Sequence, residues 1–380
     1  MAGAHSPSYV RNLEPGVTTL DGVRGLALLQ VLLAHTHYVL NADPLAIDVT
    51  RWTLINRIFE PGYLGLDVFF TLSGFLITCL LLRDLSRRKE TGERATSVIR
   101  RFYIRRALRL LPALYVMLAL AWLWTLVTND VSQHIQWRTT YSAILYIANW
   151  ATVWNLPATN PDLGHLWSLA VEEQFYIVWP VALLLIVKFC RTVQSKLILV
   201  TLLALAVTLH RVDLYNDGVN WLFVYIRTDT RIDSMLIGAF FAIVFRYVRL
   251  DQRLVSIAAW GGLVGILYYK FADPPGDLFT VGFTRTAVFV GLCLLAAASG
   301  GWSMNKVLSW KPLAALGRYS YGMYLYHHVV FLGVGRHLSQ FSQSFRLVVA
   351  YGLSALLTFL SWRFVESRCL ELKSRFETRH

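Results

Sequence analysis

The 380-residue sequence is poor in cysteine and in acidic residues, and it has no internal repeat or low-complexity segment. Its cysteines are far apart and form no Cys-x-x-Cys pair, at Cys79, Cys190, Cys293 and Cys369. This spacing argues against a disulfide framework and against a zinc site, so we expect no bound metal. We also expect no soluble domain at either end, and no cleavable signal peptide, because no small-residue cleavage site follows the first apolar run.

Apolar residues are abundant instead. They make up 56% of the chain, and the mean hydropathy is +0.48. Apolar runs of roughly 18 residues recur along the whole length, which predicts an all-α, polytopic integral membrane protein with about ten transmembrane helices. The predicted spans are Leu20–Leu40, Gly62–Leu82, Leu108–Thr128, Val171–Phe189, Leu197–His210, Ile232–Phe245, Leu254–Phe271, Gly282–Ser299, Ser320–Gly335 and Leu347–Trp362.

The positive charge of the chain is unevenly placed. Lysine and arginine outnumber aspartate and glutamate by 36 to 23, a formal net charge of +13. When the spans alternate in direction, ten Lys and Arg fall in the loop from Arg83 to Arg109 and five in the tail from Arg363. Cytoplasmic segments carry this excess, so we predict cytoplasmic termini and a multi-pass protein of the inner (plasma) membrane. The surplus charge is then an orientation signal, and no nucleic-acid partner is expected.

These assignments predict one membrane domain, residues 20–368, between cytoplasmic tails at 1–19 and 369–380. The segment from Thr140 to Leu156 is apolar and aromatic but is interrupted by Asn149 and Asn155. We expect a re-entrant or interfacial piece there, packed against protein, since exposed irregular backbone is not tolerated in lipid.

The first predicted span contains an arginine and a histidine on one face. Arg24 and His35 are eleven residues apart, which at ~100° per residue aligns them ~16 Å apart along a helix. A charged side chain inside a bilayer costs at least ~2.5–3.5 kcal/mol, so it rarely persists without a function. Arg24 has an alternative as a snorkelling side chain paired with Asp21. His35 is a candidate general base, and His37 points away from that face.

A basic stripe precedes the third span. Arg101, Arg105 and Arg109 recur every four residues, and Arg106 lies beside them. Guanidinium groups bind phosphate through two parallel hydrogen bonds, which suits a phosphate-bearing cytoplasmic ligand. Binding to anionic lipid headgroups explains the stripe equally well.

Carboxylates, aromatics and a further histidine are predicted in the outer half. Asp67 lies at the depth of His35. Glu172 lies at the start of the fourth span between Trp167 and Tyr176, where it could orient His35 or bind sugar hydroxyls, or simply favour a helix N-terminus. The remaining candidates are Arg231 and Asp233, whose alternative role is an ion pair with each other, and Tyr321, Tyr324 and His327 in the ninth span.

Five motifs occur in an order that resembles the acyltransferase family 3 membrane proteins, over Leu20 to about Arg368. They are Leu-Asp-Gly-x-Arg24-Gly with His35, Gly-x-Asp67-x-Phe-Phe-x-x-Ser-Gly-Phe-Leu, an arginine-rich helix ending Leu-Pro112, Trp167-Ser-Leu-x-x-Glu172-x-x-Phe-Tyr176, and Ser320-Tyr-x-x-Tyr324-Leu-x-His327. The resemblance implies an O-acyltransferase. It would move an acyl group, often acetyl, from cytoplasmic acyl-CoA to a hydroxyl of a cell-envelope or lipid-linked carbohydrate, or of a sugar-bearing metabolite.

The resemblance also implies roles. Arg106 and Arg109, supported by Arg105, would hold the CoA phosphates. Acyl-CoA would be a co-substrate, with no permanently bound cofactor. His35 would act as base or carry the acyl group, Arg24 would meet the pantetheine arm or thioester, and Glu172 or Asp67 would orient His35. The predicted acceptor-binding or oxyanion residues are Trp167, Tyr176, Arg231, Asp233, Tyr321, Tyr324 and His327. Many relatives carry a fused esterase-like domain. The short tail predicts a stand-alone form whose extracytoplasmic partner, if any, is a separate protein.

Two alternatives use the same residues differently. Intramembrane arginine, histidine and aspartate also serve proton-coupled carriers, so a transporter of a lipid-linked sugar or small solute is the alternative function. Against it, the sequence shows no repeated half and no paired broken helices. A scaffold within an envelope complex, with purely structural polar residues, is the third.

Overall fold

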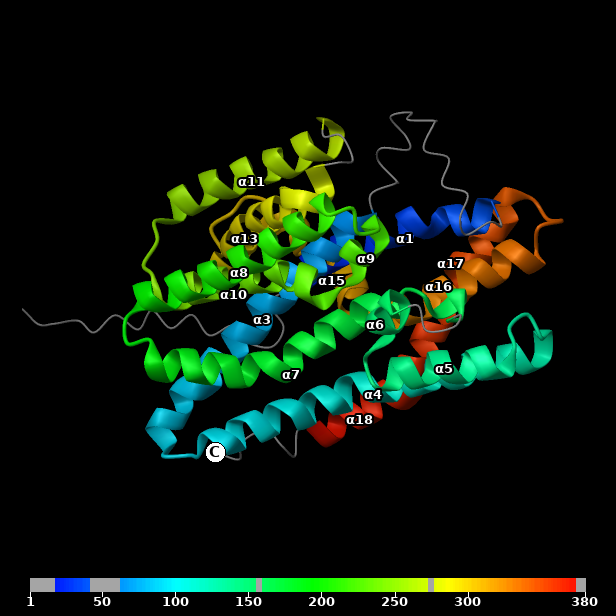
Figure 1. Ribbon diagram of the computed structural model, residues 1–380, viewed down its shortest axis with the longest axis horizontal. Coiled ribbons are helices and arrows are strands. Elements are labelled where there is room, and N and C mark those ends of the chain that lie inside the picture. The colour runs from blue at the N-terminus through cyan, green and yellow to red at the C-terminus, as the bar shows by residue number, and fades with distance from the viewer. Residues whose placement is uncertain (1–17, 42–61, 155–158, 273–276, 374–380) are drawn as a thin grey trace, which may run out of the picture.

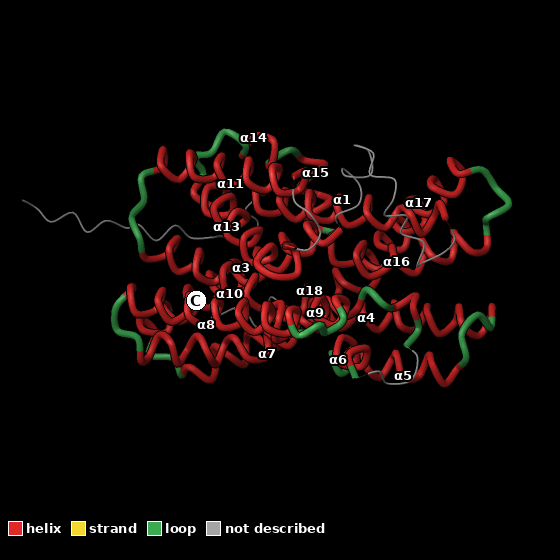
Figure 2. The backbone as a smooth tube through the Cα atoms, turned by 45° about the horizontal axis from the view of Figure 1, so that its top comes forward, coloured by secondary structure: helices red, strands yellow, loops and turns green. Residues whose placement is uncertain are grey.

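A computed structural model describes residues 18–41, 62–154, 159–272 and 277–373. Within these residues every regular element is helical, and no strand occurs (Figure 2). The predicted all-α class is therefore confirmed.

Eight helical segments of the described chain are long and apolar enough to cross a membrane. They are α1 (Thr18–Asn41), α3 (Gly62–Thr91), α4 (Ala95–Thr128), α7 (Leu166–Phe189), α8 (Val193–Asn216), α11 (Gln252–Ala272), α13 (Phe283–Ser299) with the π-turn η2 (Leu278–Gly282) before it, and α17 (Gln343–Ser361) continued by η3 (Trp362–Glu366) and α18 (Ser367–Lys373). The protein is thus a multi-pass membrane protein, as predicted.

The other two predicted spans are helices as well, α10 (Thr228–Tyr247) and α16 (Ser320–His337). They are not among the eight because α10 carries more charge, and because α16, which is 18 residues long, has a low mean hydropathy owing to polar residues that include His327 and His328. Both hold polar side chains that are buried among neighbouring helices, Arg231 and Asp233 in α10 and His327 and His328 in α16. A helix that buries its polar residues against protein needs less apolar surface than one that faces lipid.

Short helices complete the chain: α5 (Gln133–Ile144), α6 (Ala148–Val153), η1 (Pro161–Leu163), α9 (Trp221–Ile226), α14 (Asn305–Leu308) and α15 (Lys311–Arg318). The described part of segment 140–156 forms the end of α5, a turn at Tyr146 with φ 55°, and α6. Its Asn149 is fully buried and donates to the carbonyl of Ile226 and the hydroxyl of Thr228. Protein groups, rather than lipid, therefore surround this polar side chain.

Glycines let the central helices approach closely. A Cβ at Gly74 of α3 would lie 1.9 Å from the carbonyl oxygen of Met235, and one at Gly238 of α10 would lie 2.0 Å from that of Thr71. Only a residue without a side chain fits at either point, as in other close helix pairs in membranes. The α3–α10 pair packs against α8 and α13. Helix α1 contacts α3 and also α15, α16 and α17 (Figure 1). Helix α1 therefore links two groups of helices, and His35 lies on the side toward α16.

Candidate active site

Four histidines meet where α1, α16 and the start of α7 come together, and we call them the histidine cluster: His35, His165, His327 and His328. Nδ1 of His35 lies 2.8 Å from Nε2 of His327, and the two rings stack with centroids 5.1 Å apart. His328 meets His35 edge-on at 5.4 Å, and His165 stacks on His328 at 4.7 Å. The cluster joins α1, α16 and the residue before α7, so three distant segments converge on one group of imidazoles.

The hydrogen bonds of the cluster define the tautomer of His35. Nδ1 of His327 lies 3.1 Å from the carbonyl oxygen of Met323 and 2.8 Å from that of Tyr324, so this nitrogen carries the proton and donates. Nε2 of His327 is then an acceptor, and Nδ1 of His35 must donate to it. The proton of His35 thus sits on Nδ1, and its Nε2 keeps a lone pair. His35 itself is half-buried.

Tyr324 fixes the start of α7 against α16. Its hydroxyl donates to the carbonyl oxygen of His165 at 3.0 Å and lies 2.5 Å from the hydroxyl of Ser168. The His165 ring is buried, and neither of its nitrogens has a hydrogen-bond partner among the described residues. Tyr324 therefore holds the backbone of His165 in place. The hydroxyl of Tyr324 is already hydrogen-bonded in doing so.

The carboxylates predicted to orient His35 have other partners. Glu172 accepts a hydrogen bond from Ser73 at 2.8 Å and lies within electrostatic range of Arg106 and Arg24. Asp67 forms an ion pair with Arg231. Neither carboxylate makes a hydrogen bond to His35 within the described structure, and His327 occupies the position that sequence reasoning gave to them.

Asp67 belongs to what we call the ion-pair network: Asp67 with Arg231, and Asp233 with Arg211. The Arg211–Asp233 pair has an N–O distance of 2.9 Å, and all four side chains are 0% exposed. The sequence suggested that Arg231 and Asp233 pair with each other. In the structure each binds a different partner, and the guanidinium of Arg231 lies 3.6 Å from the ring centroid of Phe283.

Two of the three predicted phosphate-binding arginines are already paired. Arg106 binds Glu173 at 2.7 Å and lies over the ring of Tyr176, 3.2 Å from its centroid. Arg105 binds Asp84 at 2.7 Å.

Arg109 differs from both. Its side chain is exposed and makes no hydrogen bond or ion pair with the described residues, although Arg24, Arg106 and Asp21 lie within electrostatic range. Arg24 pairs with Asp21 at 2.8 Å, as its alternative interpretation predicted. Arg109 is therefore the guanidinium of the stripe that keeps its donors available for a ligand.

The remaining predicted aromatics have structural contacts. Trp167 packs against Tyr225 with ring centroids 4.8 Å apart, and Tyr321 donates to the carbonyl oxygen of Leu110 on α4 at 2.9 Å. Their roles in acceptor binding stay predictions. Sequence reasoning gave no role to His165, His328 or Arg211. An arginine directly after an apolar run was the available signal for Arg211, because the buried Asp233 needs a cation.

The fold and the site define a class: a polytopic helical membrane protein with a histidine cluster and, apart from it, an arginine whose guanidinium is unpaired in the described structure. The chain belongs to the acyltransferase family 3, whose model, described as an acyltransferase domain, matches residues 17–363. This confirms the resemblance drawn from the five motifs.

Three relatives of this chain are all named as O-acetyltransferases. The chain is 27% identical to the peptidoglycan O-acetyltransferase OatA of Listeria monocytogenes over 92% of its own length and 55% of the relative's. It is 29% identical to the putative peptidoglycan O-acetyltransferase YrhL of Bacillus subtilis, over 91% and 54%, and 29% identical to the O-acetyltransferase OatA of Staphylococcus aureus, over 96% and 57%. The chain thus spans about half the length of these relatives. No solved structure matches it.

Proposed function

We propose that the protein is an O-acyltransferase that moves an acetyl group from acyl-CoA to a hydroxyl of a cell-envelope carbohydrate. The observation that carries the proposal is the hydrogen bond from Nδ1 of His35 to Nε2 of His327, because it leaves Nε2 of His35 able to accept a proton. The relatives named as peptidoglycan O-acetyltransferases support the reaction type and the class of acceptor.

In this reaction Nε2 of His35 takes the proton of the acceptor hydroxyl as its oxygen attacks the thioester carbonyl. An ester C–O bond forms, the C–S bond breaks, and the proton passes from the imidazolium to the CoA thiolate. His327 accepts the hydrogen bond from Nδ1 of His35 throughout and so keeps the reactive nitrogen oriented. The group that orients His35 is thus a second imidazole. Unlike a carboxylate in the same place, an imidazole needs no counter-ion.

The donor side rests on Arg109. A guanidinium binds phosphate through two parallel hydrogen bonds, and Arg109 has its donors available while Arg105 and Arg106 are held by Asp84 and Glu173. Arg24, half-buried and within electrostatic range of Arg109, adds positive charge to the same region. We assign this region to the phosphates of CoA.

The test uses purified protein in lipid nanodiscs with labelled acetyl-CoA and a cell-wall disaccharide. We expect CoA thiol release coupled to labelling of the disaccharide, and a loss of about 10²–10⁴-fold in His35→Gln. His37→Gln is the matched control, because His37 is two residues away on α1 and binds the carbonyl of Ala34 instead of the cluster.

Two results would contradict the proposal. One is CoA release at the wild-type rate in His35→Gln. The other is movement of a sugar across proteoliposomes without any CoA release, which would indicate a carrier. Label retained on His35 itself would replace base catalysis by an acyl-imidazole intermediate on the same nitrogen.

A further inference from the structure

The short 3₁₀ helix η1 contacts the histidine cluster through its backbone. The carbonyl oxygen of Asp162 lies 2.9 Å from Nδ1 of His328. A carbonyl oxygen can only accept a hydrogen bond, so Nδ1 of His328 carries a proton and donates. The contact therefore fixes both the orientation of the His328 ring and the nitrogen that bears its proton.

The His328 ring in turn supports two other members of the cluster. It meets His35 edge-on with centroids 5.4 Å apart, and His165 stacks on it at 4.7 Å. His35 is also stacked on His327, to which its Nδ1 is hydrogen-bonded. A catalytic ring keeps its orientation when the rings around it are themselves locked by packing and hydrogen bonds. The direction of Nε2 of His35 therefore depends on His328 as well as on His327.

An ion pair sets the position of Asp162. Its carboxylate is 4% exposed, and Nη1 of Arg336 lies 2.8 Å from Oδ1 and donates to Oδ2 at 3.0 Å. Arg336 follows His328 by eight residues on α16, which is ~12 Å along the helix. Because a carboxylate this buried needs a counter-ion, the pair fastens η1 to α16. Helix α16 thus holds Asp162 twice, by its carboxylate and by its carbonyl.

Helix α5 holds η1 as well. Asn160, the N-cap of η1, accepts a hydrogen bond from the backbone N–H of Asp162 at 2.9 Å and donates to Oε1 of Gln136 at 2.8 Å. Its own backbone N–H donates to the hydroxyl of Thr139 at 2.7 Å. Asn160, Gln136 and Thr139 are all buried. Segments that only connect helices usually run over the surface, whereas η1 is buried and hydrogen-bonded to two helices. These contacts indicate that its placement matters.

We propose that Asp162 is a positioning residue of the active site. Held by Arg336, it fixes His328 through its backbone carbonyl, and His328 keeps His35 in the orientation from which Nε2 accepts a proton. This inference rests on the proposed function and adds a support for the base that lies outside the cluster. A small displacement of a catalytic group lowers the rate of the chemical step, so the effect belongs to kcat.

The test changes the ion pair and leaves the backbone carbonyl in place. In nanodiscs with acetyl-CoA and a cell-wall disaccharide, Asp162→Ala should lower kcat about tenfold. The KM for acetyl-CoA should stay unchanged, because the contact assigned to CoA, at Arg109, is not altered. Arg336→Gln should act in the same direction, and Arg336→Lys, which keeps a cation, should recover most of the rate. If Asp162→Ala fails to fold, the two Arg336 variants carry the test, since Arg336 is partly exposed.

A second measurement detects the proton on His328 directly. NMR of protein with isotope-labelled histidine nitrogens distinguishes a protonated Nδ1 from an unprotonated one, and the His328 signal is assigned by its loss in His328→Phe. We expect a protonated Nδ1 in the wild type and a mixture of tautomers in Asp162→Ala. A residue that only stabilised the fold would leave the tautomer of the folded protein unchanged.

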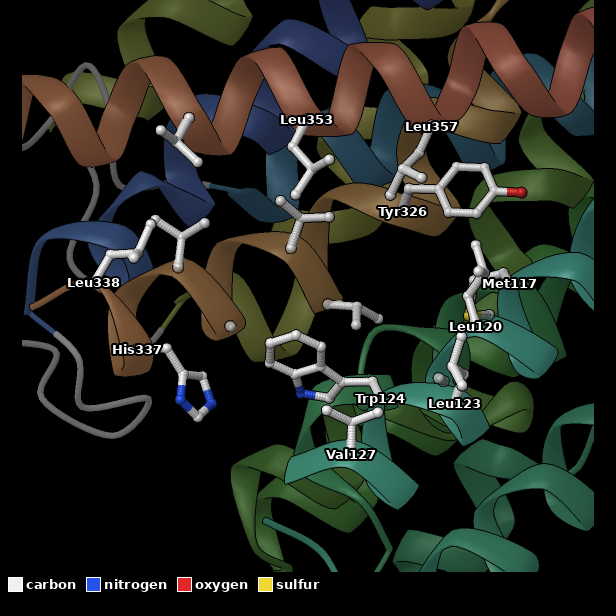
Figure 3. A pocket seen from close by; sticks show the side chains of 16 residues that line it. Met117, Leu120, Leu123, Trp124, Val127, Tyr326, His337, Leu338, Leu353 and Leu357 are labelled. Carbon is white, nitrogen blue, oxygen red and sulfur yellow. The ribbon is translucent and has the colours of Figure 1, made fainter. Parts of the chain in front are cut away.

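The next residue on α16 provides the matched control. His337 lies beside Trp124 at the apolar groove between α4, α16 and α17 (Figure 3). It binds Asp130, which follows α4, with Nε2 and Oδ2 2.7 Å apart. His337→Ala removes a polar contact from the same end of α16 but none of those that hold η1. Its kcat and its His328 tautomer should stay at the wild-type values.

Three outcomes separate the possibilities. An unchanged kcat and an unchanged His328 tautomer in Asp162→Ala and Arg336→Gln overturn the inference. An equal fall of kcat in His337→Ala also overturns it, because any loosening of the end of α16 would then suffice. A His328 tautomer that depends on Asp162, in a protein that releases no CoA from acetyl-CoA, would support this positioning contact and contradict the proposed function.

Discussion

The protein buries two groups of polar side chains, the ion-pair network and the histidine cluster, and it satisfies them in opposite ways. In the network, two arginines and two aspartates neutralise each other, and every side chain is 0% exposed. In the cluster, four imidazoles contact one another, and the chain of hydrogen bonds ends at Nε2 of His35. The network leaves no charge uncompensated, whereas the cluster leaves nitrogen lone pairs unused, among them the one on Nε2 of His35.

This difference follows from the cost of charge in an apolar interior. An ionised group there needs a counter-ion, so it is held by that partner and its contribution is structural. A neutral imidazole needs none, so it can be buried and still accept a proton. The comparison assigns the network to holding α3, α8, α10 and α13 together and the cluster to chemistry.

The largest expected effect breaks the network. Arg211→Met leaves Asp233 buried without its cation and removes hydrogen bonds to Thr230 and Thr284, so the free energy of unfolding should fall by ~3–5 kcal/mol. Replacing both partners, in Arg211→Met with Asp233→Leu, should restore much of it, because no charge remains uncompensated. Denaturant unfolding in mixed micelles measures both. A double variant as unstable as the single one would show that the arginine contributes more than neutralisation.

The second prediction concerns the cluster. His327→Phe removes the acceptor for Nδ1 of His35, so acetyl transfer should fall about 100-fold while the free energy of unfolding changes little. His327→Gln keeps an acceptor oxygen near the same place and should recover part of the rate. Equal rates in the two variants would show that His327 acts only by packing. A loss of folded protein in both would make the cluster as structural as the network.

The sequence predicted the fold class and the position of His35 but not its partner. Composition and apolar runs suffice for a helical membrane protein, and helical spacing suffices to place His35 and His37 on different faces of their helix. The partner, His327, lies 292 residues away, and the rotation and depth at which α16 meets α1 come from packing that no local pattern encodes.

The suggested ion pair between Arg231 and Asp233 was wrong, and the sequence already contained the reason. Residues two apart on a helix point ~200° from each other, so these side chains face different neighbours. Glu172 and Glu173 are separated by ~100° for the same reason, and they bind Ser73 and Arg106. Applying the helical period inside each motif would have excluded the wrong pair, although Asp67 and Arg211 as the actual partners required the structure.

The smallest expected effect extends the comparison to the basic stripe, where Arg109 is unpaired and its neighbours are paired. Arg109→Ala should raise the KM for acetyl-CoA about tenfold with little change in kcat, because hydrogen bonds from a guanidinium to a charged ligand contribute ~1.5–3 kcal/mol. Arg101→Ala removes the same charge from the same helix, at a residue bound to Glu93, and should leave KM unchanged.

Arg106 is the less informative position, although the sequence ranked it equally with Arg109. Arg106→Ala leaves Glu173 buried without its cation, so any rise in KM would be mixed with a loss of stability. Arg109 has no such partner in the described structure, and its substitution therefore isolates the ligand contact. If Arg109→Ala and Arg101→Ala changed KM equally, the stripe would act through its summed charge, as an attachment to anionic lipid does, and the distinction between paired and unpaired arginines would lose its functional meaning.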